Sequence, residues 1–134
     1  SNIKPLSGIA GLYFIFSQSI DIQYPFEKSK LLYIGMSERK TNSIASRLSG
    51  HFDGKSKNIG LTNYRKVEPL LFTYINFEML QNIWHFRIED LESYFLLNFV
   101  EYFGVYPICN NKTGFEIRNN KLDTYFKIDW DYFK

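Results

Sequence analysis

Three short apolar runs constrain the fold of this chain more than any other feature of its sequence. They cover residues 11–16, 30–35 and 70–75, and each is rich in aromatic and β-branched side chains and bounded by glycine, proline or polar residues. Runs of this length and composition are typical of β-strands. Because the connections between them favour antiparallel pairing, the sequence predicts a small, mainly antiparallel sheet of three strands.

A short helix is predicted between the second and third runs. Ile44 and Leu48 lie four residues apart, so both face one side of a helix. The polar residues at 41–43 offer N-capping oxygens ahead of them. Gly50 and Gly54 predict the end of this helix, because glycine is common just beyond helix C-termini.

Two further helices are predicted after the third run. The first covers 77–86, and the second covers 88–103 and stops at Gly104. Apolar side chains recur every four residues along the second helix, which marks it as a core helix. In the tail from residue 115 onward, apolar residues alternate with charged ones, so we expect one or two terminal strands. The segments 17–29 and 55–60 are expected to be connections.

Length and composition predict one folded domain over residues 1–134. A chain of 134 residues with 45% hydrophobic and 22% charged residues can bury one core, but not two of ordinary size. No apolar stretch approaches the roughly 20 residues of a membrane span, and the polar start does not resemble a signal peptide, so we expect a cytoplasmic protein without membrane contact. Cys109, the single cysteine, cannot form an internal disulfide and is expected to be buried as a small apolar residue.

Charge is unevenly distributed along the chain. Between Lys28 and Lys66 there are nine basic and two acidic residues, whereas the net charge of the whole chain is only +2. A basic stretch of this kind predicts a positive face that attracts polyanions such as nucleic acids. A solvated basic loop without a partner explains the same charges, and the charge pattern alone does not choose between the two interpretations.

Two tyrosines lie beside glycines in the first two runs, within Gly-Leu-Tyr at 11–13 and Tyr-Ile-Gly at 33–35, and Arg47 follows them. Apolar strands usually bury their side chains. Two tyrosines beside glycines, followed by a basic helix, therefore indicate phenols that are held at a sheet edge and face a ligand, for which phosphate is the obvious candidate. The structural alternative is a pair of strand tyrosines whose rings pack in the core and whose hydroxyl groups reach water, together with a solvated surface arginine.

The two tripeptides, Arg47, Glu92 on the predicted long helix and Asn110 after a proline follow one another in that order. This ordered set resembles the motif of the GIY-YIG nuclease superfamily over a core from about 11 to 111, with 112–134 as a C-terminal extension. The resemblance implies an α+β fold with a small three-stranded antiparallel sheet flanked by helices, to which the extension adds a strand or hairpin. It also implies metal-dependent hydrolysis of DNA phosphodiester bonds. Two connections are longer than is usual in that family, namely the one between the two tripeptides and the one from Glu92 to Asn110.

The resemblance implies a role for each residue near the phosphate. Tyr13 handles a proton, with its pKa lowered from about 10 by a neighbouring metal or cation, and Tyr33 supports it. Arg47 clamps the phosphate, because its planar guanidinium matches phosphate oxygens. His51 lies one helical turn after Arg47, so we expect it to address the same phosphate or to carry a second proton. The other histidine, His85, is expected to be structural.

Glu92 is the implied ligand of a single Mg²⁺ ion, for which Mn²⁺ can substitute, and Glu101 is the alternative. One carboxylate is enough, because Mg²⁺ takes most of its ligands from water and substrate phosphate. Asn110 is expected to tether the active-site loop or a phosphate, and Asn111 can take its place by a shift of one residue. Six basic residues are expected to hold the nucleic-acid backbone without reading its sequence, namely Arg39, Lys40, Lys55, Lys57, Arg65 and Lys66.

The predicted function is a small metal-dependent endonuclease that cleaves DNA, with RNA left open as a substrate and with a partner protein or appended domain to select targets. A second interpretation keeps the fold and the basic face without catalysis, and describes a nucleic-acid-binding module. A third describes a protein-interaction domain whose contact surface is the aromatic tail, formed by Tyr125, Phe126, Trp130, Tyr132 and Phe133.

Overall fold

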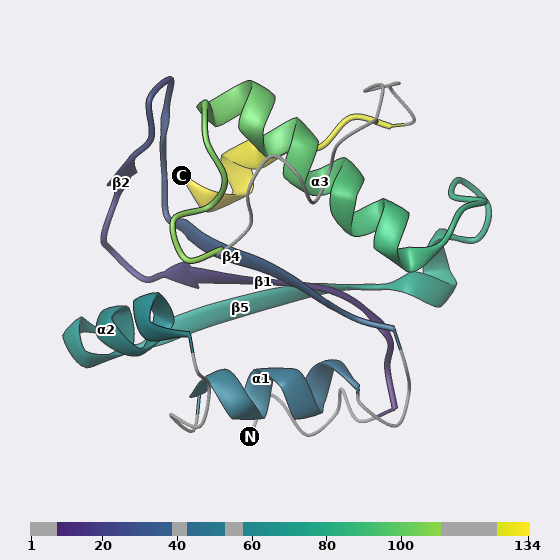
Figure 1. Ribbon diagram of the computed structural model, residues 1–134, viewed down its shortest axis with the longest axis horizontal. Helices are drawn as coiled ribbons and strands as arrows, with labels where there is room; N and C mark the ends of the chain where they lie inside the picture. Colours follow the sequence, from purple (N-terminus) through teal and green to yellow (C-terminus); the bar gives the residue numbers. More distant parts are fainter. Residues whose placement is uncertain (1–7, 39–42, 53–57, 111–125) are drawn as a thin grey trace.

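The chain is built around a three-stranded antiparallel sheet in a computed structural model that describes residues 8–38, 43–52, 58–110 and 126–134. The strands are β1 (Gly11–Ser17), β4 (Leu31–Ser37) and β5 (Leu70–Asn76), and their order in the sheet is β4-β1-β5 (Figure 1). The predicted antiparallel sheet is therefore confirmed. Each strand begins and ends within two residues of its predicted run.

β1 is the central strand, and its side chains point alternately to two covered faces. Tyr13 lies opposite Gly35 of β4 and Tyr74 of β5 in the antiparallel registers. Phe14 points to the other face, where its ring centroid lies 5.6 Å from that of Phe95. All but one of the β1 residues are buried, as expected of a strand between two neighbours with both faces covered.

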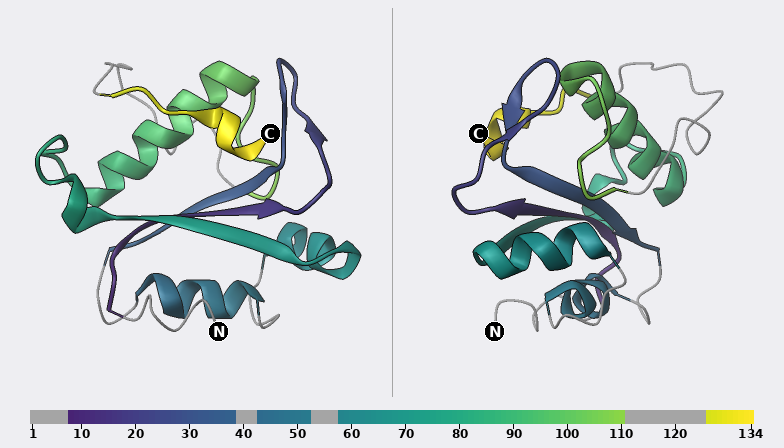
Figure 2. Two further views of the ribbon diagram at one scale, coloured as in Figure 1. Left: turned by 180° about the vertical axis from the view of Figure 1, so that it is seen from behind. Right: turned by 60° about the vertical axis from the view of Figure 1, so that its left-hand side comes forward.

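Helices cover both faces of the sheet. In Figures 1 and 2, α1 (Ile44–Phe52) lies on one face and α3 (Ile88–Phe103) lies on the opposite face. A further helix, α2 (Ile59–Val67), lies on the α1 side near the start of β5. The bounds of α3 match the prediction, and Gly104 caps it with a φ of 101°, a conformation that favours glycine. None of the described helices has the length and apolar character needed to cross a membrane.

Two segments near the first strands differ from their predictions. α1 continues past Gly50, so this glycine lies inside the helix and does not end it. The segment 17–29 was expected to be a plain connection, but it contains a hairpin of two-residue strands, β2 (Ile22–Gln23) and β3 (Lys28–Ser29). Its few residues are mostly polar, so they carry no apolar alternation that marks a strand. A buried tyrosine in this hairpin, Tyr24, donates a hydrogen bond to the backbone of β4 and fastens the two together.

Two helical segments differ as well. α2 begins inside the expected connection 55–60, because the Asn58 side chain accepts a hydrogen bond from the amide of Leu61 and caps the helix. Leu61 is the one buried residue of α2, so no apolar stripe signals this helix in the sequence. The segment 77–86 was predicted to be a helix, but it forms only a 3₁₀ turn, η2 (Phe77–Leu80), with no buried residue to stabilise a longer helix.

The end of the chain does not form the predicted strand or hairpin within residues 126–134. It forms a 3₁₀ turn, η3 (Trp130–Phe133), which begins where the Asp129 carboxylate accepts a hydrogen bond from the Asp131 amide. Trp130 and Phe133 are both buried and lie three residues apart, which is the period of a 3₁₀ turn and not that of a strand. The earlier part of the predicted tail lies outside the described residues.

The aromatic tail contributes to the core between the sheet and α3. Trp130 packs edge-on against Phe99, with ring centroids 5.2 Å apart, and its Nε1 donates to Asn98 Oδ1 at 2.7 Å. Phe133 packs against Phe14, with centroids 5.7 Å apart. Tyr132 is exposed, whereas Tyr125 lies outside the described residues. Most aromatic side chains of the described tail therefore pack in the core, which argues against the tail as a surface for binding another protein.

Candidate active site

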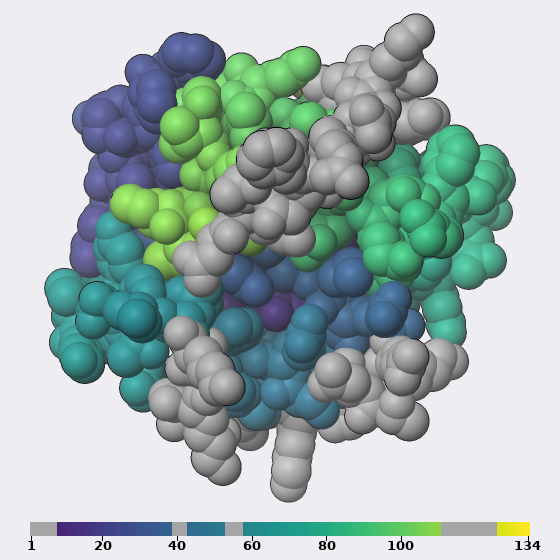
Figure 3. All heavy atoms as spheres, in the orientation of Figure 1, coloured from purple at the N-terminus to yellow at the C-terminus, as the bar shows by residue number. Residues whose placement is uncertain are grey.

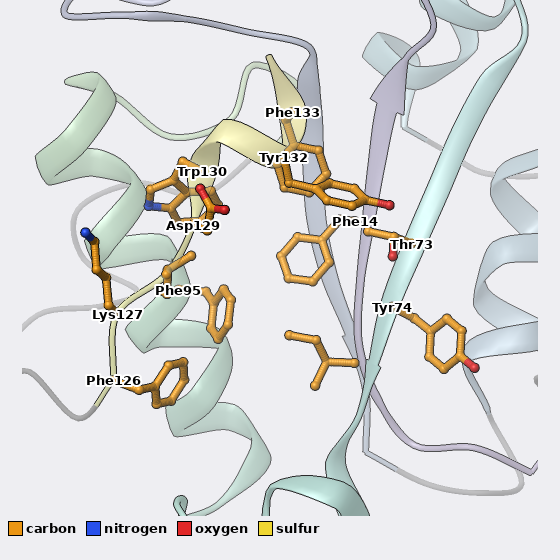
Figure 4. Close-up of a pocket in the computed structure, with 12 residues that line it drawn as sticks. Phe14, Thr73, Tyr74, Phe95, Phe126, Lys127, Asp129, Trp130, Tyr132 and Phe133 are labelled. Carbon is orange, nitrogen blue, oxygen red and sulfur yellow. The ribbon is translucent and has the colours of Figure 1, made fainter.

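Hollows lie on both faces of the sheet. The larger, of about 340 Å³, lies between the sheet, α3 and the C-terminal segment, and Figure 4 shows the aromatic rings that wall it, among them Phe14, Phe95 and Phe133. The smaller, of about 260 Å³, lies on the α1 face, which Figure 3 shows hollowed where α1 borders β4. Its lining residues are Tyr13, Tyr33, Ser46, Arg47, Gly50 and His51. Because the smaller hollow gathers four of the six predicted catalytic residues, namely Tyr13, Tyr33, Arg47 and His51, we place the candidate site there.

The glycines of the two tripeptides are required by close approaches in the sheet. A Cβ atom at Gly35 would lie 2.4 Å from Cζ and 2.5 Å from the hydroxyl oxygen of Tyr13, so the Tyr13 ring occupies the space above Gly35. A Cβ atom at Gly11 would lie 1.9 Å from the carbonyl oxygen of Ile75 in β5. Both distances are too short for any side chain. Gly11 therefore lets β1 and β5 approach each other, and Gly35 lets the Tyr13 ring cross β4.

Replacing Gly35 with alanine tests this placement of the Tyr13 ring. The new methyl group must displace the ring, and we expect a loss of about 1–3 kcal/mol in the free energy of unfolding, the usual cost of overpacking. Urea unfolding measures the loss. In a Tyr13→Ala background the same change should cost much less, because no ring remains to be displaced. Equal costs in both backgrounds would show that Gly35 is needed for another reason.

Two rings, those of His51 and Tyr33, lie beside Tyr13. The Tyr13 hydroxyl oxygen lies 3.1 Å from Nε2 of His51, which comes from α1. The Tyr33 ring centroid lies 6.0 Å from that of Tyr13 and 5.2 Å from that of His51. These contacts join side chains from β1, β4 and α1, so the structure brings together three residues that the sequence predicted to share a site.

Arg47 lies beside these rings, one helical turn before His51. Its side chain is exposed, and its Nε donates to the carbonyl oxygen of Met36 in β4 at 3.3 Å. This bond holds the guanidinium group at the rim of the hollow. A guanidinium group held in this way can present N–H donors to a phosphate that enters from solvent.

Burial and neighbouring charges set the protonation of the central pair. Burial is the main cause that raises the pKa of Tyr13, with a further increase from Tyr33, while Arg47 lowers it by a smaller amount. The pKa of His51 is lowered from 6.5, first by burial and then by the positive charge of Arg47. At neutral pH the pair is therefore a protonated phenol and a neutral imidazole. Among the protein's own groups, burial outweighs the nearby cation, and the expected lowering of the Tyr13 pKa by a bound metal stays a prediction.

Glu92 does not line the hollow, but it is the described carboxylate whose charge acts on Tyr13. It is buried in the first half of α3, and its charge contributes to the raised pKa of Tyr13. Its neighbours Glu89 and Asp90 instead contact Arg87, at 3.4 Å and 3.3 Å, at the start of the helix. Glu101 is exposed, and nine helical residues place it about 13 Å further along the axis.

The donor groups near Glu92 fit a single hard cation. The described residues contain no cluster of three or more histidine, cysteine or acidic side chains arranged to hold a metal. Mg²⁺ does not need such a cluster, since one or two carboxylates, water and substrate phosphate usually complete its octahedron. The buried carboxylate of Glu92, whose charge acts on the Tyr13 phenol, supplies oxygen ligands of the kind that Mg²⁺ prefers.

Asn110 tethers the outer edge of β4. Its Oδ1 accepts a hydrogen bond from the Ile34 amide at 3.0 Å, and its Nδ2 donates to the Ile34 carbonyl oxygen at 2.9 Å. Ile34 lies between Tyr33 and Gly35, so this amide pair fixes the strand at the point where the Tyr13 ring crosses it. The alternative residue Asn111 lies outside the described residues. Cys109, next to Asn110, is buried as expected.

The basic residues are described only in part. Arg65 and Lys66 are exposed on the last turn of α2, where they can meet a polyanion. The other four, Arg39, Lys40, Lys55 and Lys57, lie outside the described residues. His85 is exposed on the connection between η2 and α3 and does not line the hollow on the α1 face.

The sequence reasoning missed two residues that line this hollow, Ser46 and Gly50. Both share the exposed side of α1 with Arg47 and His51, because helical residues three or four positions apart lie on one face. The spacing from Arg47 to Gly50 and His51 is visible in the sequence, but the glycine was interpreted as a helix end.

Comparisons with protein-family models, with curated proteins and with solved structures find no match for this chain. The observations that bear on its function are therefore its sequence motif and the geometry of this hollow.

Proposed function

We propose that the chain is a metal-dependent endonuclease that hydrolyses DNA phosphodiester bonds, with a site of the GIY-YIG type. The observation that carries the proposal is the convergence of Tyr33, Arg47 and His51 around Tyr13 in one hollow, with the charge of buried Glu92 acting on Tyr13 from α3. These residues come from four separate elements, β1, β4, α1 and α3. A phenol, a neutral base and a guanidinium line one hollow, and a buried carboxylate acts on the same phenol from α3; these are the groups that phosphodiester hydrolysis requires.

Arg47 binds the phosphate in this proposal. Charge builds up on the non-bridging oxygens as a nucleophile attacks phosphorus, and a fixed guanidinium stabilises that charge more than it stabilises the ground state. Its bond to the Met36 carbonyl orients the group before substrate arrives, so little reorganisation is needed. Glu92 would hold a Mg²⁺ ion, which supplies Lewis-acid stabilisation of the same charge when bound.

Tyr13 and His51 move the proton of the attacking water. The Tyr13 hydroxyl oxygen accepts a proton from water while its own proton passes to Nε2 of His51, so the imidazole becomes an imidazolium and the phenol stays neutral. The raised pKa of Tyr13 and the lowered pKa of His51 keep both partners in the protonation states that this relay needs at neutral pH. Tyr33 supports the relay by contacting both rings.

A plasmid-nicking assay tests the proposal. Purified protein is incubated with supercoiled plasmid in Mg²⁺, in Mn²⁺ and in EDTA, and its affinity for a labelled duplex is measured over a range of salt concentrations. We expect nicking in Mg²⁺ or Mn²⁺ and none in EDTA, with affinity that falls as salt rises. Salt-sensitive binding without nicking in any metal would favour the non-catalytic binding module. Absence of both would leave neither nucleic-acid function standing.

The pH dependence of nicking should have an acid limb set by His51. Only the neutral imidazole accepts the Tyr13 proton, so kcat/KM should fall as pH decreases below 6.5, the ordinary histidine value, because the His51 pKa is lowered from it. His85→Gln is the matched control, since it removes an exposed histidine outside the site. A His51→Gln protein with the same acid limb would show that another group titrates.

The same shift makes stability depend on pH. Below about pH 6.5 the unfolded chain takes up a proton at His51 that the folded chain binds less readily, so this contribution is present above pH 6.5 and is lost as pH falls. Urea unfolding between pH 5 and pH 7.5 should therefore give a smaller decrease for His51→Gln than for the wild type.

A further inference from the structure

Nothing in the part of the chain that the structure describes requires glycine at position 50. Its backbone does not have the positive φ that favours glycine, which among the described residues occurs at Gly8 and Gly104. A Cβ atom at Gly50 would meet no atom of the described residues within 4 Å. It does not cap α1 either, because the helix continues to Phe52. The methyl group of an alanine would thus fit the folded protein without displacing anything described.

Glycine at this position is also unfavourable for the helix. Within a helix, glycine loses more backbone freedom on folding than alanine or leucine and is among the poorest helix formers. α1 has nine residues, so one poor helix former is a substantial fraction of it. The chain therefore keeps a destabilising residue at a site where packing does not demand it, and this points to a requirement outside the folded chain itself.

The position of Gly50 identifies that requirement. It lines the hollow between Arg47, which lies three residues before it, and His51, which follows it. A substrate that contacts the Arg47 guanidinium and also reaches the Tyr13–His51 pair must pass over the surface of α1 at Gly50. A side chain there would project into the space that such a substrate occupies.

We propose that Gly50 provides clearance for the sugar-phosphate backbone of the substrate strand, which lies directly against α1 between Arg47 and His51. This inference rests on the proposed nuclease function and adds a residue that determines which substrates can enter. The occupant is a nucleic-acid strand, because its repeating anionic backbone meets both the guanidinium clamp and the proton-transfer pair. Gly50 is a positional requirement for binding and takes no part in the chemistry.

The test uses Gly50→Ala and Gly50→Leu, because both replacements are good helix formers of different size. We expect the Tm of each variant to rise by roughly 2–5 °C, since helix propensity improves and a Cβ atom at position 50 meets nothing described. Nicking of supercoiled plasmid should fall at least about tenfold in kcat/KM for Gly50→Leu and by less for Gly50→Ala. Affinity for a labelled duplex in Ca²⁺, a non-catalytic substitute, should weaken in the same order.

Ser49→Ala is the matched control. Ser49 lies in the same helix but does not line the hollow, so this change should also improve helix propensity while nicking stays unchanged. A Gly50→Leu protein that is more stable and nicks and binds at the wild-type level would overturn the clearance inference while leaving the nuclease proposal intact. A lower Tm for both Gly50 variants would also overturn it, because glycine would then have a structural role. A wild-type protein that neither binds nor nicks DNA would instead overturn the proposed function, and the inference with it.

Discussion

Replacing Arg47 with alanine is expected to lower metal-dependent nicking by about 10³-fold. Arginine side chains that stabilise charge on a transferring phosphoryl group contribute on the order of 10³ or more to the rate, and single oxyanion donors contribute about 10²–10³. Arg47 is the cation that lines the hollow next to the Tyr13–His51 pair. Because its side chain is exposed, the same change should leave the Tm within a few degrees of the wild type.

Two further variants separate a catalytic clamp from a general charge effect. Arg65→Ala is the matched control, because Arg65 is also exposed and also donates one bond to a backbone carbonyl, that of Phe52 at 3.4 Å. We expect it to weaken DNA binding at low salt with little change in kcat. Arg47→Lys keeps the charge but not the planar fork, so it should recover only part of the lost rate. Equal losses for Arg47→Ala and Arg65→Ala would mean that Arg47 acts only through its charge.

The elements of this fold could be predicted where a local pattern coincided with burial. The three strands and α3 each have an apolar pattern with the period of the structure that they form, and their bounds were predicted to within two residues. α2 has one buried side chain and begins at a cap supplied by Asn58, so its sequence looks like that of a loop. The tail shows the opposite case, because alternating residues resembled a strand although Trp130 and Phe133 are buried at the spacing of a 3₁₀ turn.

The candidate site was less predictable, because its geometry depends on register and on packing between distant segments. The sequence identified Tyr13 and Gly35 separately. Only the pairing of β1 with β4 shows that the Tyr13 ring requires a glycine at position 35. The burial that raises the pKa of Tyr13 could not be predicted either, because burial under neighbouring elements is not visible in a sequence motif. Asn110 was predicted as a tether, yet the sequence alone does not identify its partner, which is the backbone of Ile34.

Replacing Glu92 with glutamine should abolish metal-dependent nicking, with a loss of at least about 10³-fold. Glutamine has nearly the same shape but no negative charge, and a neutral amide is a much weaker ligand for Mg²⁺ than a carboxylate is. Mn²⁺ binding, followed by electron paramagnetic resonance in the absence of DNA, gives a readout independent of activity and should weaken in parallel. Binding of duplex DNA in EDTA should persist, because the basic residues are unchanged.

Glu101→Gln is the matched control for this experiment, since it makes the same chemical change on the same helix about 13 Å further along its axis. We expect it to nick plasmid and bind Mn²⁺ as the wild type does. Full activity of purified Glu92→Gln would falsify the assignment of Glu92 as the metal ligand, and loss of activity in Glu101→Gln alone would transfer that role to Glu101. If both variants are active, then the metal takes its protein ligand from neither glutamate, and Glu92 makes only the smallest of the contributions to the raised pKa of Tyr13. That outcome would retain the proton relay of Tyr13 and His51 and would require a different metal site.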